Sequence, residues 1–259
     1  MNVGASTSNL YPMLTEDALA CLLKMEFRNI EVFINTESEA EPAFSRSLRR
    51  QAETAGANIR SLHPYISGTE PYLLFSAYER RFHDGLKIYE KIFQSANEMG
   101  ASLVVMHGDK VNGVLPVAES IGRYEILFDL GQQYGVTLAQ ENVFRFRSSD
   151  NAYLRSMRDQ LGDKAHFVLD FKQCVRCGHT VEEVMDAMGD AIVHVHVSDQ
   201  DEKHDCLLPG HGRLDYAALF RRLKTYGFSG TLMLELYRCN FHIPEDLADG
   251  RRKLEEFVW

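Results

Sequence analysis

The sequence predicts an α/β fold, a single (β/α)8 TIM barrel over residues 1–259. Three observations lead to this prediction: the chain length, a glycine repeated where helices should end, and eight short apolar runs. A barrel of this kind has about 250 residues, and the chain has 259. No linker, proline-rich tract or low-complexity stretch indicates a second domain.

A glycine precedes most of the apolar runs by a few residues. Each glycine directly follows a segment whose apolar residues have helical spacing. Glycine ends a helix without steric cost because it adopts the left-handed backbone conformation. The glycines are Gly56, Gly100, Gly135, Gly162, Gly189, Gly227 and Gly230. The turn between Met25 and Phe27 has no glycine, so it must close in another way.

The eight apolar runs are the expected strands. A buried parallel strand has a nearly continuous apolar sequence, and helices connect such strands. The runs cover residues 3–6, 30–34, 59–63, 102–106, 136–140, 166–170, 192–197 and 231–236. A doubly wound sheet would also alternate strands with helices. It would more typically carry a Gly-rich phosphate loop after the first strand, and this chain has none there.

The segments between the runs have the start signals of helices. Thr15 precedes two acidic residues, which favour the positive end of a helix dipole. Thr180 and Glu183 have the spacing of a capping box, and Asp215 precedes a segment with one apolar face. Helices are therefore expected to begin at these positions.

Composition argues against several classes of protein. The net charge is −9, whereas a nucleic-acid binder normally has a basic face. The N-terminus lacks the pattern of a secretory signal, and no apolar run approaches the about 20 residues of a membrane span. We expect a cytoplasmic protein with a small-molecule partner, no nucleic acid and no membrane, which could form a homo-oligomer. The cysteine count of five is odd, and Cys174 and Cys177 are expected to be reduced thiols.

Four polar residues end four consecutive apolar runs: Glu141, Asp170, His196 and Glu235. A charged residue at the end of a buried strand has left the core, and in a barrel this end forms the active site. Adjacent strands lie about 5 Å apart, so the four side chains can share one ion. Three carboxylates and one imidazole favour an open site for Mn²⁺, Mg²⁺ or Co²⁺, with Zn²⁺ as the alternative.

Further histidines are expected near the same end of the barrel. His63 ends the third run and His107 follows the fourth, so each could bind the metal or a substrate hydroxyl. His194 lies two residues before His196, deeper on the same face, and is interpreted as a hydrogen-bonded core residue. Residues 64–80 and 198–214 form the longest loops, and long loops are typically functional.

With these residues in place, the chain resembles the xylose isomerase-like TIM barrels. These include sugar isomerases and epimerases and the endonuclease IV-type enzymes. The resemblance lies in SLHPY (61–65), VVMHG (104–108), QEN (140–142), LDFKQ (169–173), HVHVSD (194–199), LLPGHGRLDY (207–216) and LMLELY (232–237). It implies that Glu141, Asp170, His196 and Glu235 hold a divalent metal and that the two glutamates also move protons. Gln173 stands where many relatives have a histidine, which disfavours a multi-zinc cluster.

The resulting hypothesis is a metal-dependent isomerase or epimerase. It would act on a ketose or a related polyhydroxy carbonyl compound through an enediolate, with Glu141 and Glu235 as the proton carriers. The expected substrate-binding residues are His63, His107, Lys172, Gln173, Arg176 and Arg238. Surface salt bridges are an equal alternative for the two arginines. The alternative functions are a metal-dependent phosphodiesterase like endonuclease IV and a barrel that binds sugar without catalysis.

Overall fold

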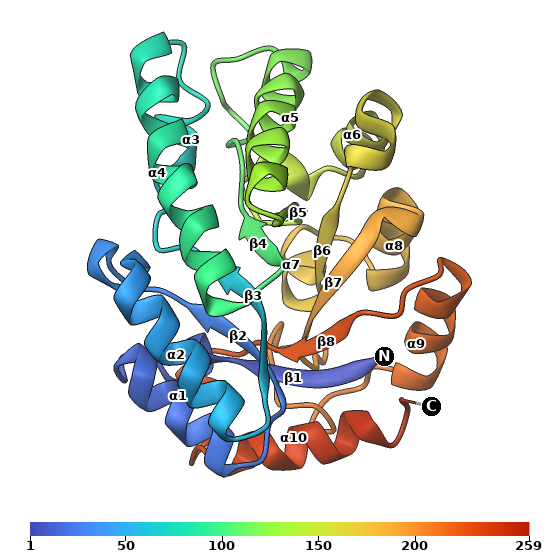
Figure 1. The fold of residues 1–259 in the computed structure, drawn as a ribbon. Helices are drawn as coiled ribbons and strands as arrows, with labels where there is room; N and C mark the ends of the chain where they lie inside the picture. The colour runs from blue at the N-terminus through green and yellow to red at the C-terminus, as the bar shows by residue number, and fades with distance from the viewer. Residues whose placement is uncertain (259) are drawn as a thin grey trace.

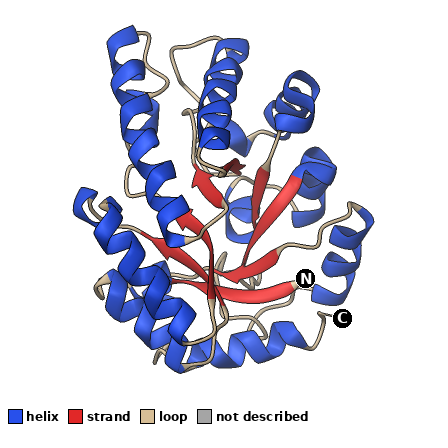
Figure 2. Ribbon diagram, viewed as in Figure 1, coloured by secondary structure: helices blue, strands red, loops and turns tan. Residues whose placement is uncertain are grey.

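The computed structural model describes residues 1–258, and within them eight parallel strands close into a barrel (Figures 1 and 2). Each strand pairs with the next, and the last pairs with the first. The predicted fold class is therefore confirmed. The strands are β1 (Asn2–Ser6), β2 (Asn29–Phe33), β3 (Asn58–His63), β4 (Leu103–Met106), β5 (Thr137–Glu141), β6 (Phe167–Asp170), β7 (Ile192–Val197) and β8 (Thr231–Leu234).

Helices surround the barrel, as Figure 2 shows in blue. Within residues 1–258 they are α1 (Thr15–Lys24), α2 (Pro42–Thr54), α3 (Glu70–Leu73), α4 (Glu79–Met99), α5 (Val117–Gln133), α6 (Asn151–Leu161), α7 (Phe171–Arg176), α8 (Val181–Met188), α9 (Tyr216–Thr225) and α10 (Asp246–Glu255). The predicted capping box of Thr180 and Glu183 is present at α8, and Asp215 caps α9. The final helix, α10, packs against β1 and β8 and so covers the closure of the barrel.

The glycines predicted to end helices have a positive φ, which glycine adopts most easily, with one exception. Their φ angles lie between 53° and 80° at the six positions from Gly56 to Gly227. Gly230 does not share this conformation; a Cβ there would lie 2.7 Å from the backbone oxygen of Val193, so close packing explains this glycine. In the turn that lacks a glycine, Glu26 itself takes the left-handed conformation, with φ at 62°.

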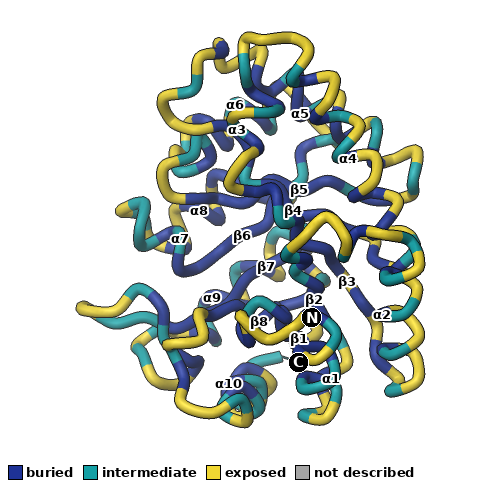
Figure 3. Tube along the Cα trace, turned by 90° about the vertical axis from the view of Figure 1, so that its left-hand side faces the viewer, coloured by how far each residue is buried: buried dark blue, intermediate teal, exposed yellow. Residues whose placement is uncertain are grey.

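The apolar core fills the barrel and the layer between the barrel and its helices. Figure 3 shows the strands as buried and the outer faces of the helices as exposed. Leu22, Phe93, Leu138 and Val195 are among the residues with no exposed surface. None of the helices within residues 1–258 has both the length and the apolar character needed to span a membrane.

Strand register sets the height of the polar groups in the barrel. Asp170 on β6 pairs with His196 on β7, so these two side chains leave the sheet at the same level. Glu31 on β2 pairs with Ser61 on β3. Because alternate residues of a strand share a face, His194 and His196 lie on the same side of β7 at two depths.

Candidate active site

The four strand-end residues lie together at the C-terminal mouth of the barrel. One ligand atom from each of Glu141, Asp170, His196 and Glu235 falls within 4.8 Å of the others. The Nδ1 atom of His196 is central: it lies 3.1 Å from Glu235 Oε2, 3.4 Å from Glu141 Oε1 and 3.5 Å from Asp170 Oδ2. The predicted convergence of these side chains is thus present in the structure.

Local structure orients Asp170 within this group. Its Oδ1 atom accepts the backbone N–H of Gln173 at 2.9 Å, which caps the N-terminus of α7. The side chain of Asn142 bonds both the N–H and the carbonyl of Asp170, at 2.7 and 3.0 Å. These contacts leave Oδ2 as the carboxylate oxygen that faces the other three residues.

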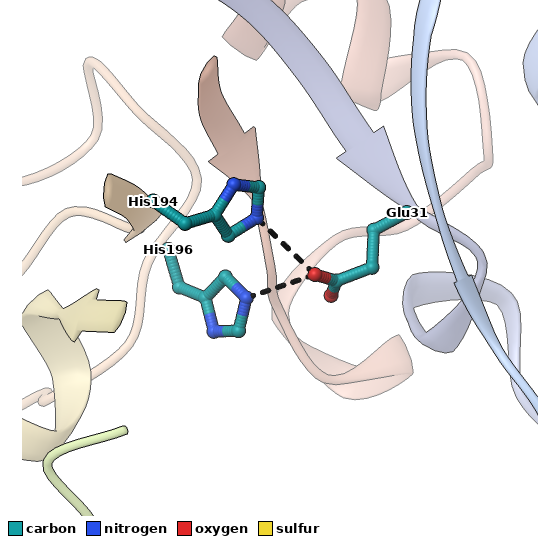
Figure 4. Close-up of side chains that lie close together, drawn as sticks. All are labelled: Glu31, His194 and His196. Carbon is teal, nitrogen blue, oxygen red and sulfur yellow. Dashed lines mark hydrogen bonds and ion pairs between the residues drawn. The ribbon is translucent and has the colours of Figure 1, made fainter. Parts of the chain in front are cut away.

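Sequence reasoning missed Glu31, which holds His196 from inside the barrel. Glu31 Oε2 lies 3.2 Å from Nε2 of His194 and 3.2 Å from Nε2 of His196 (Figure 4). The hydroxyl of Ser61 donates to the same oxygen at 2.7 Å. Burial raises the pKa of Glu31, but the two imidazoles hold it well below its usual range, so the carboxylate is ionised. The sequence signal that could have indicated Glu31 is a charged residue inside the apolar run 30–34.

The Glu31 contact decides which nitrogen of His196 faces the mouth. An ionised carboxylate only accepts hydrogen bonds, so Nε2 of His196 carries the proton. Nδ1 is then the nitrogen that faces the three carboxylates and that a metal ion would bind after displacing the proton they attract to it. Such an arrangement, in which a carboxylate fixes the tautomer of an imidazole, is common behind metal-ligating histidines.

The residues present fit a divalent metal ion. Among the described residues, His196 Nδ1 and Glu141 Oε2 are buried and have no hydrogen-bond partner. Burial lowers the pKa of His196, but Glu235, Glu31, Asp170 and Glu141 raise it well above its usual range. The carboxylates therefore attract positive charge to this centre. Three carboxylates and one imidazole are a donor set that a divalent cation accepts.

A lysine side chain also reaches this centre. The Lys172 ammonium contacts Asp170 Oδ2 and Glu235 Oε2, and the side chain is buried. Burial lowers the pKa of Lys172, but Asp170, Glu235 and Glu141 raise it well above its usual range. Burial raises the pKa of Asp170 to about 6, against the lowering effect of Lys172. Lys172 is thus a buried cation in contact with two of the candidate metal ligands.

A cavity of ≈ 340 Å³ opens above the four residues. It is lined by the predicted residues Glu141, Glu235, His63, His107, Lys172 and Gln173, and by Ser8, Tyr11, Phe33, Asn35, Leu236 and Tyr237, which the sequence did not single out. Its lining combines charged and polar side chains with the rings of Tyr11, Phe33 and Tyr237. This combination is typical of a site for a small polar molecule.

His63 and His107 lie beside Glu141. Their Nε2 atoms are 3.6 and 3.1 Å from Glu141 Oε2 and 3.2 Å from each other. The ring of Phe33 stacks on His63 with centroids 4.5 Å apart. The side-chain amide of Gln140 donates to the carbonyl of His107 at 2.7 Å and so fixes the loop after β4 against β5.

The two predicted substrate-binding arginines lie elsewhere. Neither Arg176 nor Arg238 is among the described residues that line the cavity. Arg176 pairs with Asp205 and donates to the hydroxyl of Tyr237. Arg238 donates to the carbonyls of Phe241 and His242 within its own loop. Both guanidinium groups hold loops at the mouth of the barrel rather than facing the cavity.

The loop after β7 is folded around one buried carboxylate. Asp199 accepts the backbone N–H groups of Gly210, Gly212 and Leu214 at 2.9, 3.0 and 3.2 Å. Neither His204 nor His211 of this loop is among the described residues that line the cavity.

Fold and site together define a (β/α)8 barrel with a buried carboxylate–imidazole cluster at its C-terminal mouth. Residues 20–257 match the xylose isomerase-like TIM barrel family. The chain belongs to this family. The predicted resemblance is confirmed.

Individual relatives are more distant. An uncharacterized protein of Mycobacterium leprae is 25% identical over 91% of this chain and 89% of its own length. The inosose isomerase of Bacillus subtilis is 28% identical over 45% of each chain. The crystal structure of a D-tagatose 3-epimerase-like protein superimposes with a TM-score of 0.82 and 18% identity, over 100% of this chain and 97% of that one. At this identity the structural likeness shows the shared fold.

Proposed function

We propose that the protein is a divalent-metal-dependent isomerase or epimerase that acts on a ketose, an inosose or a related polyhydroxy carbonyl compound. The observation that carries the proposal is that Glu141 and Glu235 line one cavity and lie on the same ligand centre, each within 3.4 Å of His196 Nδ1. Two carboxylates that face one small polar molecule can remove a proton and return it. The names of the tagatose epimerase-like and inosose isomerase relatives agree with this chemistry.

Glu141, Asp170, His196 and Glu235 would hold the metal. When bound, the ion supplies Lewis-acid stabilisation of the negative charge that develops on the substrate oxygens. The enediolate formed from a carbonyl and its neighbouring hydroxyl is the species that needs this stabilisation.

Glu141 is the better candidate for the residue that removes the proton alpha to the carbonyl. Its Oε1 atom lies 3.4 Å from His196 Nδ1, at the proposed metal position, whereas Oε2 faces His63 and His107, which line the cavity, so one oxygen remains for the proton. Glu235, after taking up a proton from solvent, would deliver it to the same carbon from the other face or to the adjacent carbon, and Glu141 would release the proton that it removed to solvent. His63, His107 and Gln173 line the cavity and would bind substrate hydroxyls.

Hydrogen exchange tests the proposal directly. The purified protein with Mn²⁺ should exchange the alpha protons of a substrate with deuterated solvent, observed by NMR across a panel of ketoses and inososes. Absence of exchange throughout the panel would contradict it. Two or three tightly bound zinc ions per chain would instead favour the phosphodiesterase alternative. A wild-type protein that binds sugar but does not turn it over, with equal sugar affinity in a Glu141→Gln variant, would favour a binding protein.

A further inference from the structure

Lys172 occupies the oxygens that a metal ion would need. Its ammonium group contacts Asp170 Oδ2 and Glu235 Oε2. These same two oxygens face His196 Nδ1, at 3.5 and 3.1 Å. The other oxygen of Asp170, Oδ1, accepts the N–H of Gln173 and is thereby directed towards the N-terminus of α7. A metal ion on the four residues and this ammonium therefore require the same oxygens.

We propose that Lys172 is a tethered competitor for the metal: its ammonium holds Asp170 and Glu235 in the metal-free protein, and a divalent ion displaces it into the cavity. This inference rests on the proposed function, because it assumes the metal of that function. Lys172 would then control the affinity of the site for the metal and also contact the substrate.

The charges of the site explain why a competitor of this kind stabilises the protein. Glu141, Asp170 and Glu235 place three carboxylates within 4.8 Å of one another in the protein interior. Buried like charges without a cation are strongly unfavourable. The ammonium supplies one positive charge, and a divalent ion supplies two at the same position, so the ion replaces the lysine when it is available.

The surroundings of Lys172 provide a place for the displaced side chain. Lys172 already lines the cavity, and the ring centroid of Tyr237 lies 6.0 Å from its Nζ atom. A lysine side chain has four flexible methylene groups, so its head can turn towards the cavity while its backbone stays in α7. Metal binding would thereby present a positive charge to the oxygens of a substrate.

The test is a Mn²⁺ titration of wild type, Lys172→Met and Lys172→Gln by calorimetry, without substrate. The apparent affinity of a site is reduced by the fraction of molecules in which it is accessible, so both variants should bind Mn²⁺ about tenfold more tightly or better. Lys110→Met is the matched control, because Lys110 is exposed and outside the cluster; its affinity should equal that of the wild type. The control also removes one positive charge.

The outcomes distinguish a failure of this inference from a failure of the proposed function. If the wild type binds Mn²⁺ and the Lys172 variants bind it equally or more weakly, Lys172 does not compete and the inference is overturned, while the proposed function stands. If no protein in the series binds a divalent metal, both are overturned.

Chemical labelling of the wild-type protein gives a second measurement that needs no variant. Acetylation by an amine-reactive reagent, read by mass spectrometry, should increase at Lys172 when Mn²⁺ is added and stay unchanged at Lys110. A Lys172 signal that does not rise with Mn²⁺ would overturn the displacement.

Discussion

Nε2 of His196 lies 3.2 Å from Oε2 of Glu31, so that an imidazole at the mouth of the barrel is held by a carboxylate in its interior. Glu31 is on β2 and His196 is on β7, and these strands are not neighbours in the sheet. Because Glu31 is ionised and accepts the proton of Nε2, the other nitrogen of His196 is free to face Glu141, Asp170 and Glu235. The interior of the barrel thus sets the chemistry of its mouth.

Replacing Glu31 with glutamine should weaken metal binding. The amide keeps the shape of the side chain but removes the charge that fixes the proton on His196 Nε2. Loss of such a partner behind a metal ligand typically costs 10–100-fold in affinity, and we expect about this decrease for Mn²⁺, measured by calorimetry.

Ser61→Ala is the control for Glu31→Gln. It removes the hydrogen bond of 2.7 Å to the same oxygen but leaves the carboxylate charge in place. Its metal affinity should stay near that of the wild type. Equal losses in both variants would indicate that packing, and not the tautomer of His196, controls the site.

Replacing either proposed proton carrier should slow turnover more than it changes substrate binding. A general acid or base contributes typically 10²–10⁴-fold, so Glu141→Gln should lower kcat by about this factor. Alpha-proton exchange should disappear with it, since Glu141 is the proposed base. Glu235→Gln should also lower kcat. The alpha proton of the substrate should still exchange with solvent in this variant, and faster than in Glu141→Gln. Faster exchange in Glu141→Gln than in Glu235→Gln would mean that Glu235 removes the proton and Glu141 returns it.

Much of the fold is readable from local sequence because each helix-to-strand turn needs a special backbone conformation. The glycine at φ 80° after α4 is one example. Glu26 shows where this reasoning ends: a non-glycine residue adopts the same conformation, at φ 62°. Arg251 donates to the carbonyl of Glu26 at 2.7 Å. This contact spans most of the chain, so no local pattern could have indicated it.

The four candidate ligands were predictable because each is polar at the end of an apolar run. Glu31 is also a polar residue next to apolar ones, but it lies inside its run and so has the pattern of an ordinary strand residue. Lys172 was named as a substrate contact, and its reach to Asp170 and Glu235 depends on how α7 turns after β6. Arg176 could not be placed from sequence, because its partner Asp205 lies in a separate loop. Arg238 bonds the carbonyls of Phe241 and His242 within its own loop, and the apolar pattern does not predict that loop conformation.

Removing the metal should lower both activity and thermal stability. Incubation with a chelator followed by its removal should give inactive protein that Mn²⁺ or Co²⁺ reactivates. A ligand that binds only the folded state stabilises it by about 2.7 kcal/mol at 100 times its Kd, which raises Tm measurably. Glu235→Ala removes one candidate ligand, so its Tm should rise less at the same Mn²⁺ concentration. An equal rise would place the ion outside the four residues.

Glu70 should make stability depend on pH. It is fully buried, and its carboxylate accepts the hydroxyl of Tyr89 at 2.6 Å and the N–H of Gly108 at 2.7 Å. Burial raises the pKa of Glu70, and His107, Tyr89, Gly108 and His63 only partly offset this. The folded state therefore holds the Glu70 proton more tightly than the unfolded state does.

The sign of this effect follows from linkage, and a variant isolates it. The stabilisation from the Glu70 proton is complete below the unfolded pKa of about 4.3 and is lost as pH rises through the higher folded pKa. Glu70→Gln does not titrate, so the free energy of unfolding of wild type minus that of Glu70→Gln should fall with pH across this window and then stay level. Urea unfolding at a series of pH values, with chelator present, measures the difference. A difference that rises with pH would mean that the charges of His63 and His107 outweigh burial, and that the ionised carboxylate is the form that holds Gly108 beside the active site.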